Sequence, residues 1–171
     1  MYKVAQLHDD DFPYISQRLD SWWGGRNMAA MLPRLWFKDF SRTSFVIKNP
    51  AGNPIAFLVG YISPQDPAKG YVHFIGVDPD YRKAGLGRKL YENFSAKVEA
   101  LGVTRIEAVT SPVNTTSLGF HESLGFMARQ SDGAYVYPSQ SEPLIDFDGT
   151  GEDRVLMVCQ LPLSRKYEVK G

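Results

Sequence analysis

One junction constrains the fold more than any other part of this 171-residue sequence. Residues 71–77 are apolar at nearly every position, which is typical of a strand that is covered on both faces. A turn containing Asp78-Pro79 follows, and apolar residues then recur at helical spacing from Leu86 to Leu101. A buried strand that leads through a short loop into an amphipathic helix is a building unit of sheets with helices on both faces.

The other periodic segments extend this unit to the order βααβββαβαββ. The predicted strands cover residues 4–7, 44–48, 55–62, 71–77, 105–110, 126–129 and 155–161. The predicted helices cover residues 9–19, 31–40, 86–101 and 115–124, and residues 130–152 are predicted to form a long loop. The sequence therefore predicts an α/β fold, with a mixed sheet and helices on both faces, as a single domain over residues 1–171.

Composition excludes several classes of function. Lysine plus arginine and aspartate plus glutamate each total 19, so the chain has no overall charge that would attract nucleic acid or an anionic membrane. The single cysteine, Cys159, allows no internal disulfide and no cysteine cluster for a metal, and it lies in an apolar run typical of a buried thiol. The longest apolar run, residues 55–62, is far shorter than the ~20 residues of a membrane span. We expect a cytoplasmic protein without metal, nucleic acid or membrane.

The loop before the long helix has the features of an anion site. The first amides of a helix have no intrahelical partner and lie at the positive end of its dipole. Gly85 and Gly87 allow a phosphate to approach the backbone closely, and Arg82 and Arg88 add positive charge. The dinucleotide fingerprint is excluded because Leu90 stands where its third glycine would be. A pyrophosphate is the natural ligand, and a plain strand-to-helix turn with incidental glycines is the alternative.

Two blocks of sequence resemble the GNAT superfamily of N-acetyltransferases. Arg82-x-x-Gly85-x-Gly87 resembles the family's acetyl-CoA motif. The segment from Asn114 to Phe126 resembles the family's second block, in which an asparagine precedes a Phe-Tyr pair and Leu-Gly-Phe closes the block. The similarity is clearest over residues 70–127. It implies a GNAT-like fold, acetyl-CoA as the cofactor and an amine as the acceptor.

The resemblance also implies cofactor-binding residues. The backbone of Val77 would pair with the pantetheine arm, and Asn114 would contact the cofactor near its thiol end. Ser117 is also expected to bind the cofactor. Asn114 also fits the N-cap of a helix, and the two roles are compatible. The pyrophosphate would be held by the amides of Arg82, Lys83, Ala84, Gly85, Leu86, Gly87 and Arg88.

Family members often protonate the departing thiolate with the tyrosine of the Phe-Tyr pair, and here that pair is Phe120-His121. We hypothesise that His121 takes this role, because histidine exchanges protons near neutrality. A packing histidine is the alternative. His73 and Glu107 are candidates for the base that deprotonates the amine. The alternatives are a hydrogen-bonded core histidine and a solvated carboxylate at a strand edge.

Trp23 and Arg26 fall between the first two predicted helices, where the family builds its acceptor site. They would bind an aromatic or acidic acceptor, and Asp148 in the long loop would bind a cationic amine. Core packing and a solvated loop are the corresponding alternatives. The acceptor is expected to be a small-molecule amine or a protein amine, and the resemblance is compatible with a homodimer.

Two further classes of function stay open. Because the family's tyrosine is missing, the chain could be a non-catalytic module that senses acyl-CoA. A nucleotide-binding regulatory domain with another phosphate ligand is the weaker alternative.

Overall fold

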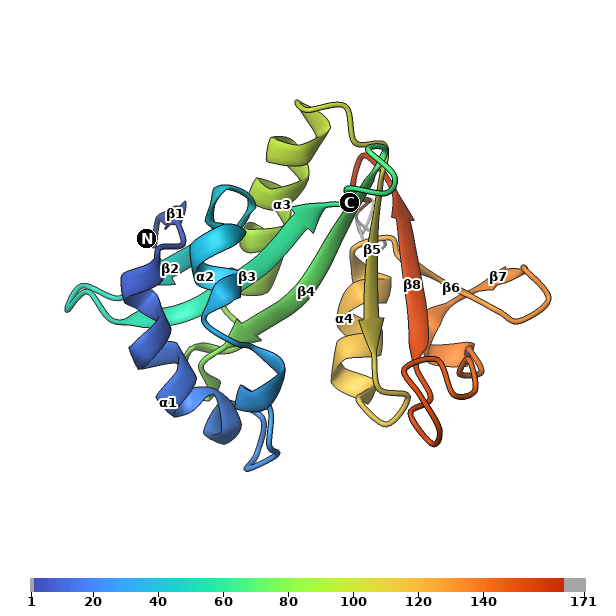
Figure 1. Ribbon diagram of the computed structural model, residues 1–171, viewed down its shortest axis with the longest axis horizontal. Helices are drawn as coiled ribbons and strands as arrows, with labels where there is room; N and C mark the ends of the chain where they lie inside the picture. The colour runs from blue at the N-terminus through green and yellow to red at the C-terminus, as the bar shows by residue number, and fades with distance from the viewer. Residues whose placement is uncertain (1, 165–171) are drawn as a thin grey trace, which may run out of the picture. The chain divides into compact units, whose positions relative to one another are not determined.

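The computed structural model describes residues 2–164, which form an α/β fold with one mixed sheet, as predicted (Figure 1). Within these residues the helices are α1 (Phe12–Trp22), α2 (Leu35–Asp39), α3 (Leu86–Glu99) and α4 (Thr115–Ser123). The sheet order is β1-β2-β3-β4-β5-β8-β6-β7. Its strands are β1 (Val4–Gln6), β2 (Phe45–Lys48), β3 (Pro54–Ile62), β4 (Lys69–Val77), β5 (Arg105–Thr110), β6 (Met127–Arg129), β7 (Tyr135–Val136) and β8 (Val155–Gln160).

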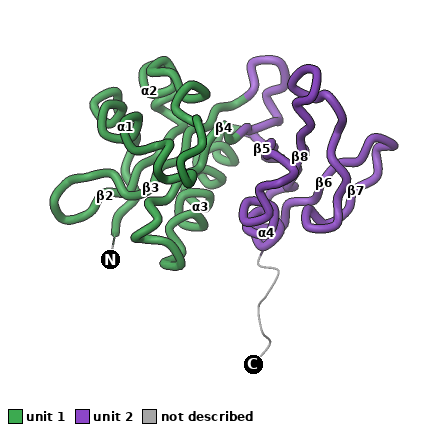
Figure 2. Tube along the Cα trace, turned by 90° about the horizontal axis from the view of Figure 1, so that it is seen from below, with its two compact units in different colours: residues 1–62, 72–101 green, residues 63–71, 102–171 purple. Residues whose placement is uncertain are grey.

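The chain divides into two compact units (Figure 2). The first comprises residues 1–62 and 72–101, and the second comprises residues 63–71 and 102–171. Strand β4 begins in the second unit and continues in the first. The expectation of a single domain stays a prediction.

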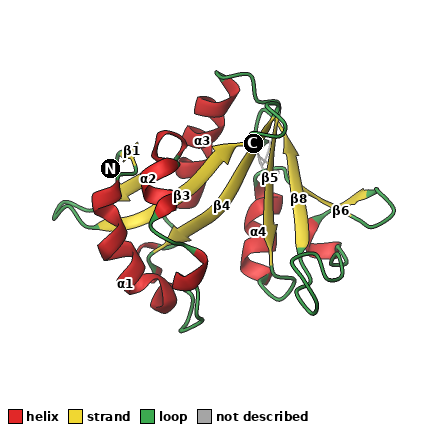
Figure 3. Cartoon of the chain, in the orientation of Figure 1, coloured by secondary structure: helices red, strands yellow, loops and turns green. Residues whose placement is uncertain are grey.

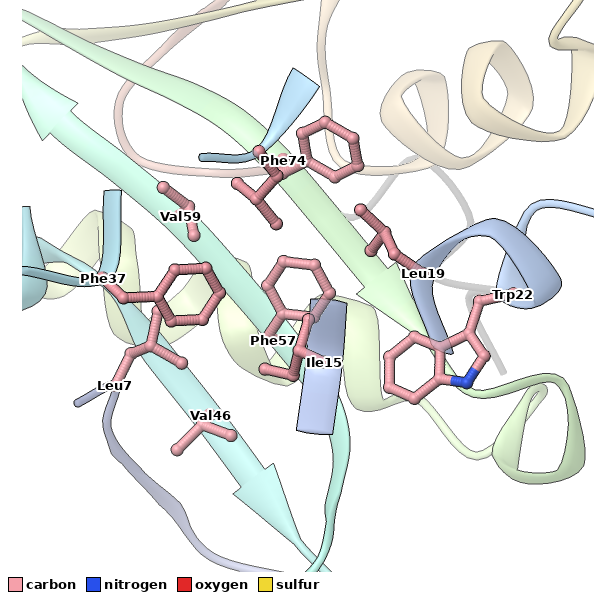
Figure 4. Packing of buried hydrophobic residues seen from close by; sticks show 10 residues of the cluster. Leu7, Ile15, Leu19, Trp22, Phe37, Val46, Phe57, Val59 and Phe74 are labelled. Carbon is pink, nitrogen blue, oxygen red and sulfur yellow. The ribbon is translucent and has the colours of Figure 1, made fainter. Parts of the chain in front are cut away.

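The first unit packs helices on both faces of β2 and β3. Because strand side chains alternate between faces, Val46 and its partner Phe57 point to one side and the next residues point to the other. Figure 4 shows Phe57 among the side chains of α1, including Ile15 and Leu19, which are fully buried. Helix α3 contacts β2 and β3 and buries Leu90 in the same unit. Figure 1 shows α1 and α3 on opposite sides of these strands.

The second unit is a smaller antiparallel arrangement. Strand β8 pairs with β5 on one side and with β6 on the other, and β6 pairs with β7. Cys159 of β8 is buried, as expected, and burial raises the pKa of its thiol to about 11. A thiol with so high a pKa is almost fully protonated at neutral pH and is therefore a poor nucleophile.

Two predicted segments differ from the structure. Residues 31–40 were expected to form one helix, but a 3-10 helix, Ala29–Met31, is followed by the short α2. Pro33 lies between them, and proline offers no backbone N–H to continue a helix. The long loop of residues 130–152 contains the two-residue strand β7, and Leu144 within it forms an isolated bridge with Arg154. Figure 3 shows that most of the chain between β6 and β8 is loop.

Residues 2–164 contain neither a membrane-spanning helix nor a cluster of metal-binding side chains. No helix in this range is long and apolar enough to cross a membrane. No group of three or more His, Cys, Asp or Glu side chains in this range is placed to hold a metal ion.

Gly76 of β4 lies so close to neighbouring side chains that no Cβ fits there. A Cβ at this position would lie 2.6 Å from Cε1 of Phe57 and 2.8 Å from Cη2 of Trp23. We therefore expect Gly76→Ala to lower the free energy of unfolding by about 1–3 kcal/mol, the usual cost of overpacking. Chemical denaturation measures this change.

A matched substitution controls for the Gly-to-Ala change itself. Gly119 lies inside α4, and nothing lies within 4 Å of a Cβ built there. Gly119→Ala should raise the free energy of unfolding by about 0.5–1 kcal/mol, because alanine favours a helix over glycine. Equal effects of the two substitutions would refute the close packing at Gly76.

Candidate functional site

The glycine loop, defined as residues 82–88, follows directly from the end of β4. The Asp78 amide donates to the carbonyl of Ile55 at 2.8 Å, and the Asp78 carboxylate accepts the Asp80 amide at 2.9 Å. This 3-10 turn, Pro79–Tyr81, reverses the chain out of the sheet. It leads into the glycine loop and then into α3, as the sequence predicted.

The glycine loop contains the first turn of α3, which begins at Leu86 after the N-cap Gly85. The bond from Lys89 N to Gly85 O, 3.1 Å long, closes the first turn of α3. The amides of residues 86–88 precede this bond, so the helix supplies no carbonyl for them. A Cβ built on Gly85 would have nothing within 4 Å. A helix start with open space at Gly85 is a geometry that suits an anion, and binding of a pyrophosphate there stays a prediction.

The loop backbone is strained at one residue. Lys83 has φ 63° and Gly85 has φ 73°, both in the left-handed region. A non-glycine residue there costs on the order of 1–2 kcal/mol. Left-handed residues within a turn aim successive amides toward one point, which makes a concave site for an anion.

The Arg82 side chain binds carbonyl oxygens. Its Nη2 donates to the carbonyl of Trp22 at 2.6 Å, and its Nε donates to the carbonyl of Val77 at 3.3 Å. The sequence predicted positive charge for a phosphate at this position, and the structure gives the guanidinium two partners at the end of α1 and the end of β4.

The second sequence block forms α4 and its cap. Asn114 is the N-cap, and its side chain accepts the Ser117 amide at 3.2 Å, which confirms the capping role expected for asparagine. The hydroxyl of Ser117 lies 3.3 Å from Nδ1 of His121. The contacts of Asn114 and Ser117 with a cofactor stay predictions.

The ring of His121 is buried in α4. His121 is only 3% exposed, and its ring packs edge-on against the ring of Phe126, with ring centroids 5.1 Å apart. Nδ1 donates to the carbonyl of Ser117 at 2.8 Å. Burial lowers the pKa of His121 to about 4. This supports the packing alternative, since few imidazolium ions would exist at neutral pH, and the role of proton donor stays a prediction.

Burial of neutral His121 should make stability depend on pH. An unfolded histidine takes up a proton near pH 6.5, whereas the folded ring does so only near pH 4. The stabilisation is therefore fully present above pH 6.5 and falls by roughly 3 kcal/mol as pH drops to 4. We expect His121→Gln to reduce this loss, measured as unfolding free energies at pH 7 and pH 5.

His73→Gln serves as the parallel variant. Burial also lowers the pKa of His73, although the hydrogen bond to Met31 opposes the shift, so its contribution has the same sign. If the unfolding free energy of His121→Gln fell between pH 7 and pH 5 by as much as that of the wild type, the burial of His121 as a neutral ring would be contradicted.

The two candidate bases both have partners. Nε2 of His73 lies 2.8 Å from the carbonyl of Met31, to which it donates, and its ring stacks on Trp36 at 4.1 Å. Glu107 accepts Nε of Arg105 at 3.2 Å, and Nζ of Lys69 lies 3.9 Å away. These contacts support a structural role for each residue, and the role of general base stays a prediction.

The predicted acceptor residues are also held by neighbours. Trp23 packs against Phe74, with ring centroids 5.2 Å apart, and Asp148 pairs with Nε of Arg154 at 2.9 Å. Arg26 is exposed. Binding of an acceptor by these residues stays a prediction.

Sequence reasoning missed Asp20. Its carboxylate accepts the amides of Met28 and Ala29 at 2.7 and 2.8 Å, and its carbonyl accepts the Gly25 amide at 2.8 Å. These bonds close the turn after α1. The available signal was an aspartate at the end of a helix before a Gly-Gly pair, because aspartate side chains bind nearby backbone amides in turns.

Comparison with known proteins decides the family. A sequence model of the acetyltransferase (GNAT) family matches residues 1–126. The chain belongs to the GNAT family. Its GNAT fold agrees with the strand and helix order predicted from the sequence, apart from the additional short strand β7.

Relatives within the GNAT family indicate what similar chains do. An L-2,4-diaminobutyric acid acetyltransferase from Streptomyces avermitilis is 37% identical over 84 residues, which cover 48% of this chain and 47% of the relative. The ribosomal protein bS18 alanine N-acetyltransferase of Escherichia coli K12 is 36% identical over 90 residues, 53% of each chain. The chain thus matches only about half the length of these relatives.

A solved GNAT structure resembles the whole chain. Diaminobutyrate acetyltransferase EctA from Paenibacillus lautus, in complex with L-2,4-diaminobutyric acid and coenzyme A, has a TM-score of 0.66 and 18% identity. The comparison covers 100% of this chain and 99% of that one. At this identity the likeness concerns the fold.

Proposed function

We propose that this GNAT protein transfers the acetyl group of acetyl-CoA to a primary amine by direct attack in a ternary complex. The observation that carries the proposal is the glycine loop, which opens α3 and has open space at the Cβ position of Gly85. The names of its relatives support the reaction, since both the diaminobutyric acid enzyme and the bS18 enzyme are acetyltransferases of amines.

The chain's own contribution at the glycine loop is electrostatic. Acetyl-CoA, when bound, supplies the thioester that the amine attacks. The amides of residues 86–88 bind the charge of the pyrophosphate, and the helix dipole of α3 adds to their effect. The backbone of Val77 holds the pantetheine arm in the proposed complex.

The acid and base of the reaction are proposed from the three candidates. His121 supplies or relays the proton to the thiolate, and His73 or Glu107 accepts the proton of the amine. Each has a structural role as well, so a loss of activity alone does not identify it. A changed limb of the profile of kcat/KM against pH, with an unchanged unfolding temperature, separates the chemical role from the structural one.

The acceptor is proposed to be a small amine or a protein amine. Trp23, Arg26 and Asp148 are the proposed contacts with it. L-2,4-diaminobutyric acid and ribosomal protein S18 are the first acceptors to test, because relatives act on them. A homodimer in the cytoplasm is the proposed state of the protein.

Release of free thiol from acetyl-CoA tests the proposed function. Purified protein is mixed with acetyl-CoA and a panel of primary amines, and coenzyme A thiol is followed against time. Amine-dependent release, with an acetylated amine seen by mass spectrometry, supports the transferase. Binding of acetyl-CoA without release for every amine would favour the acyl-CoA sensor, which the missing tyrosine keeps open.

A further inference from the structure

Arg82 joins three parts of the first unit. Its backbone opens the glycine loop, its Nε binds the last carbonyl of β4 at Val77, and its Nη2 binds the last carbonyl of α1 at Trp22. The shorter of these bonds, 2.6 Å, spans 60 residues of sequence. The end of α1 is thereby attached directly to the proposed cofactor loop.

The acceptor segment, defined as residues 23–28, begins at this attachment. Trp23 packs on the backbone of β4 so closely that Gly76 cannot carry a Cβ. Gly24 and Gly25 then turn the chain in the left-handed region, with φ 67° and 87°. Asp20 binds both the Gly25 amide and the Met28 amide, which closes the segment on the end of α1. Its position therefore follows the position of that helix end.

We propose that Arg82 is a positioning residue that fixes the acceptor segment to the glycine loop, so that cofactor and acceptor binding are coupled through its two carbonyl bonds. The acceptor role of residues 23–28 rests on the proposed function. We call the two carbonyl bonds of Arg82, to Val77 and Trp22, the clamp, and these bonds do not depend on the proposed function. A cofactor that holds the glycine loop in place then also holds Arg82, and through Trp22 it stabilises the acceptor segment.

Only arginine has the geometry for this clamp. A planar guanidinium carries donors at fixed angles, so Nε and Nη2 reach two separate carbonyls at once. The ammonium of lysine is a single point at the end of a flexible stem and cannot reproduce this fork. Arg82→Lys therefore retains the charge at the loop while it removes the paired geometry.

Hydrogen exchange of the acceptor segment tests the clamp without cofactor or acceptor. In Arg82→Lys and in Arg82→Gln, the amides of Gly25 and Met28 should exchange about tenfold faster than in the wild type, since a lost hydrogen bond lowers the cost of local opening. The control is Arg42→Lys, an exposed arginine of the same unit, which should leave these amides unchanged. Wild-type exchange of both amides in both Arg82 variants would overturn the proposal.

Steady-state kinetics then test the coupling. Arg82→Lys should raise the acceptor KM about tenfold while the Kd of acetyl-CoA changes by less than about threefold. Equal changes in both constants would make Arg82 a cofactor ligand and refute the clamp. A protein that shows faster exchange but transfers no acetyl group would retain the clamp and lose the proposed function, so the two failures are distinct.

Discussion

Gly85→Asp is expected to weaken the binding of acetyl-CoA about a hundredfold. The carboxylate would enter the open space at Gly85, at the start of α3, where we place the pyrophosphate. Two negative unit charges 4 Å apart, such as this carboxylate and a phosphate, repel each other by about 4 kcal/mol at an effective dielectric of 20. Exposure to solvent and salt reduces this repulsion. Isothermal titration calorimetry with acetyl-CoA measures the change in Kd.

Gly85→Asn is the matched control. Asparagine and aspartate have nearly the same shape, and both tolerate the left-handed conformation at φ 73° better than other side chains. The asparagine variant should weaken binding by no more than about tenfold. If the two variants bound acetyl-CoA equally well, the pyrophosphate would not lie at Gly85.

Phe57→Ala should lower the free energy of unfolding by about 3–5 kcal/mol, the range for removal of a buried aromatic ring. Phe57 is fully buried on β3, and its ring stacks on Phe74 and lies beside Trp22. The cavity would open beneath the end of α1. Denaturation by urea, monitored by circular dichroism, measures the loss.

Leu101→Ala provides the comparison for Phe57→Ala. Leu101 is 60% exposed just after α3, so its truncation should change stability by less than about 0.5 kcal/mol. A small loss for Phe57→Ala, similar to that for Leu101→Ala, would contradict the packing of the first unit around β3.

Periodic segments made most of the fold predictable. The apolar run of β4 and the apolar stripe of α3 are long enough to identify a buried strand and an amphipathic helix from spacing alone. Shorter elements lack that information. Strand β7 has two residues, too few for an alternating pattern, and Pro33 shortens α2 to Leu35–Asp39.

The position of the glycine loop in the backbone could be predicted from the sequence, but the hydrogen-bond partners of the side chains around it could not. Glycines and a helix start indicate an anion loop because the amides need no distant partner. The partners of Arg82 and His73, the carbonyls of Trp22 and Met31, lie 60 and 42 residues away in sequence. Such contacts depend on how distant elements pack together, and local sequence patterns do not predict them.

Titration of the wild-type protein with acetyl-CoA, by calorimetry, is the most direct test of the central claim that the glycine loop binds the cofactor's pyrophosphate. We predict one site with a Kd near or below ~10 µM, which corresponds to about −7 kcal/mol. The heat of binding should be lost in Gly85→Asp and retained in Gly85→Asn. No binding of acetyl-CoA by the wild-type protein would contradict the account, and the glycine loop would then be only a turn between β4 and α3.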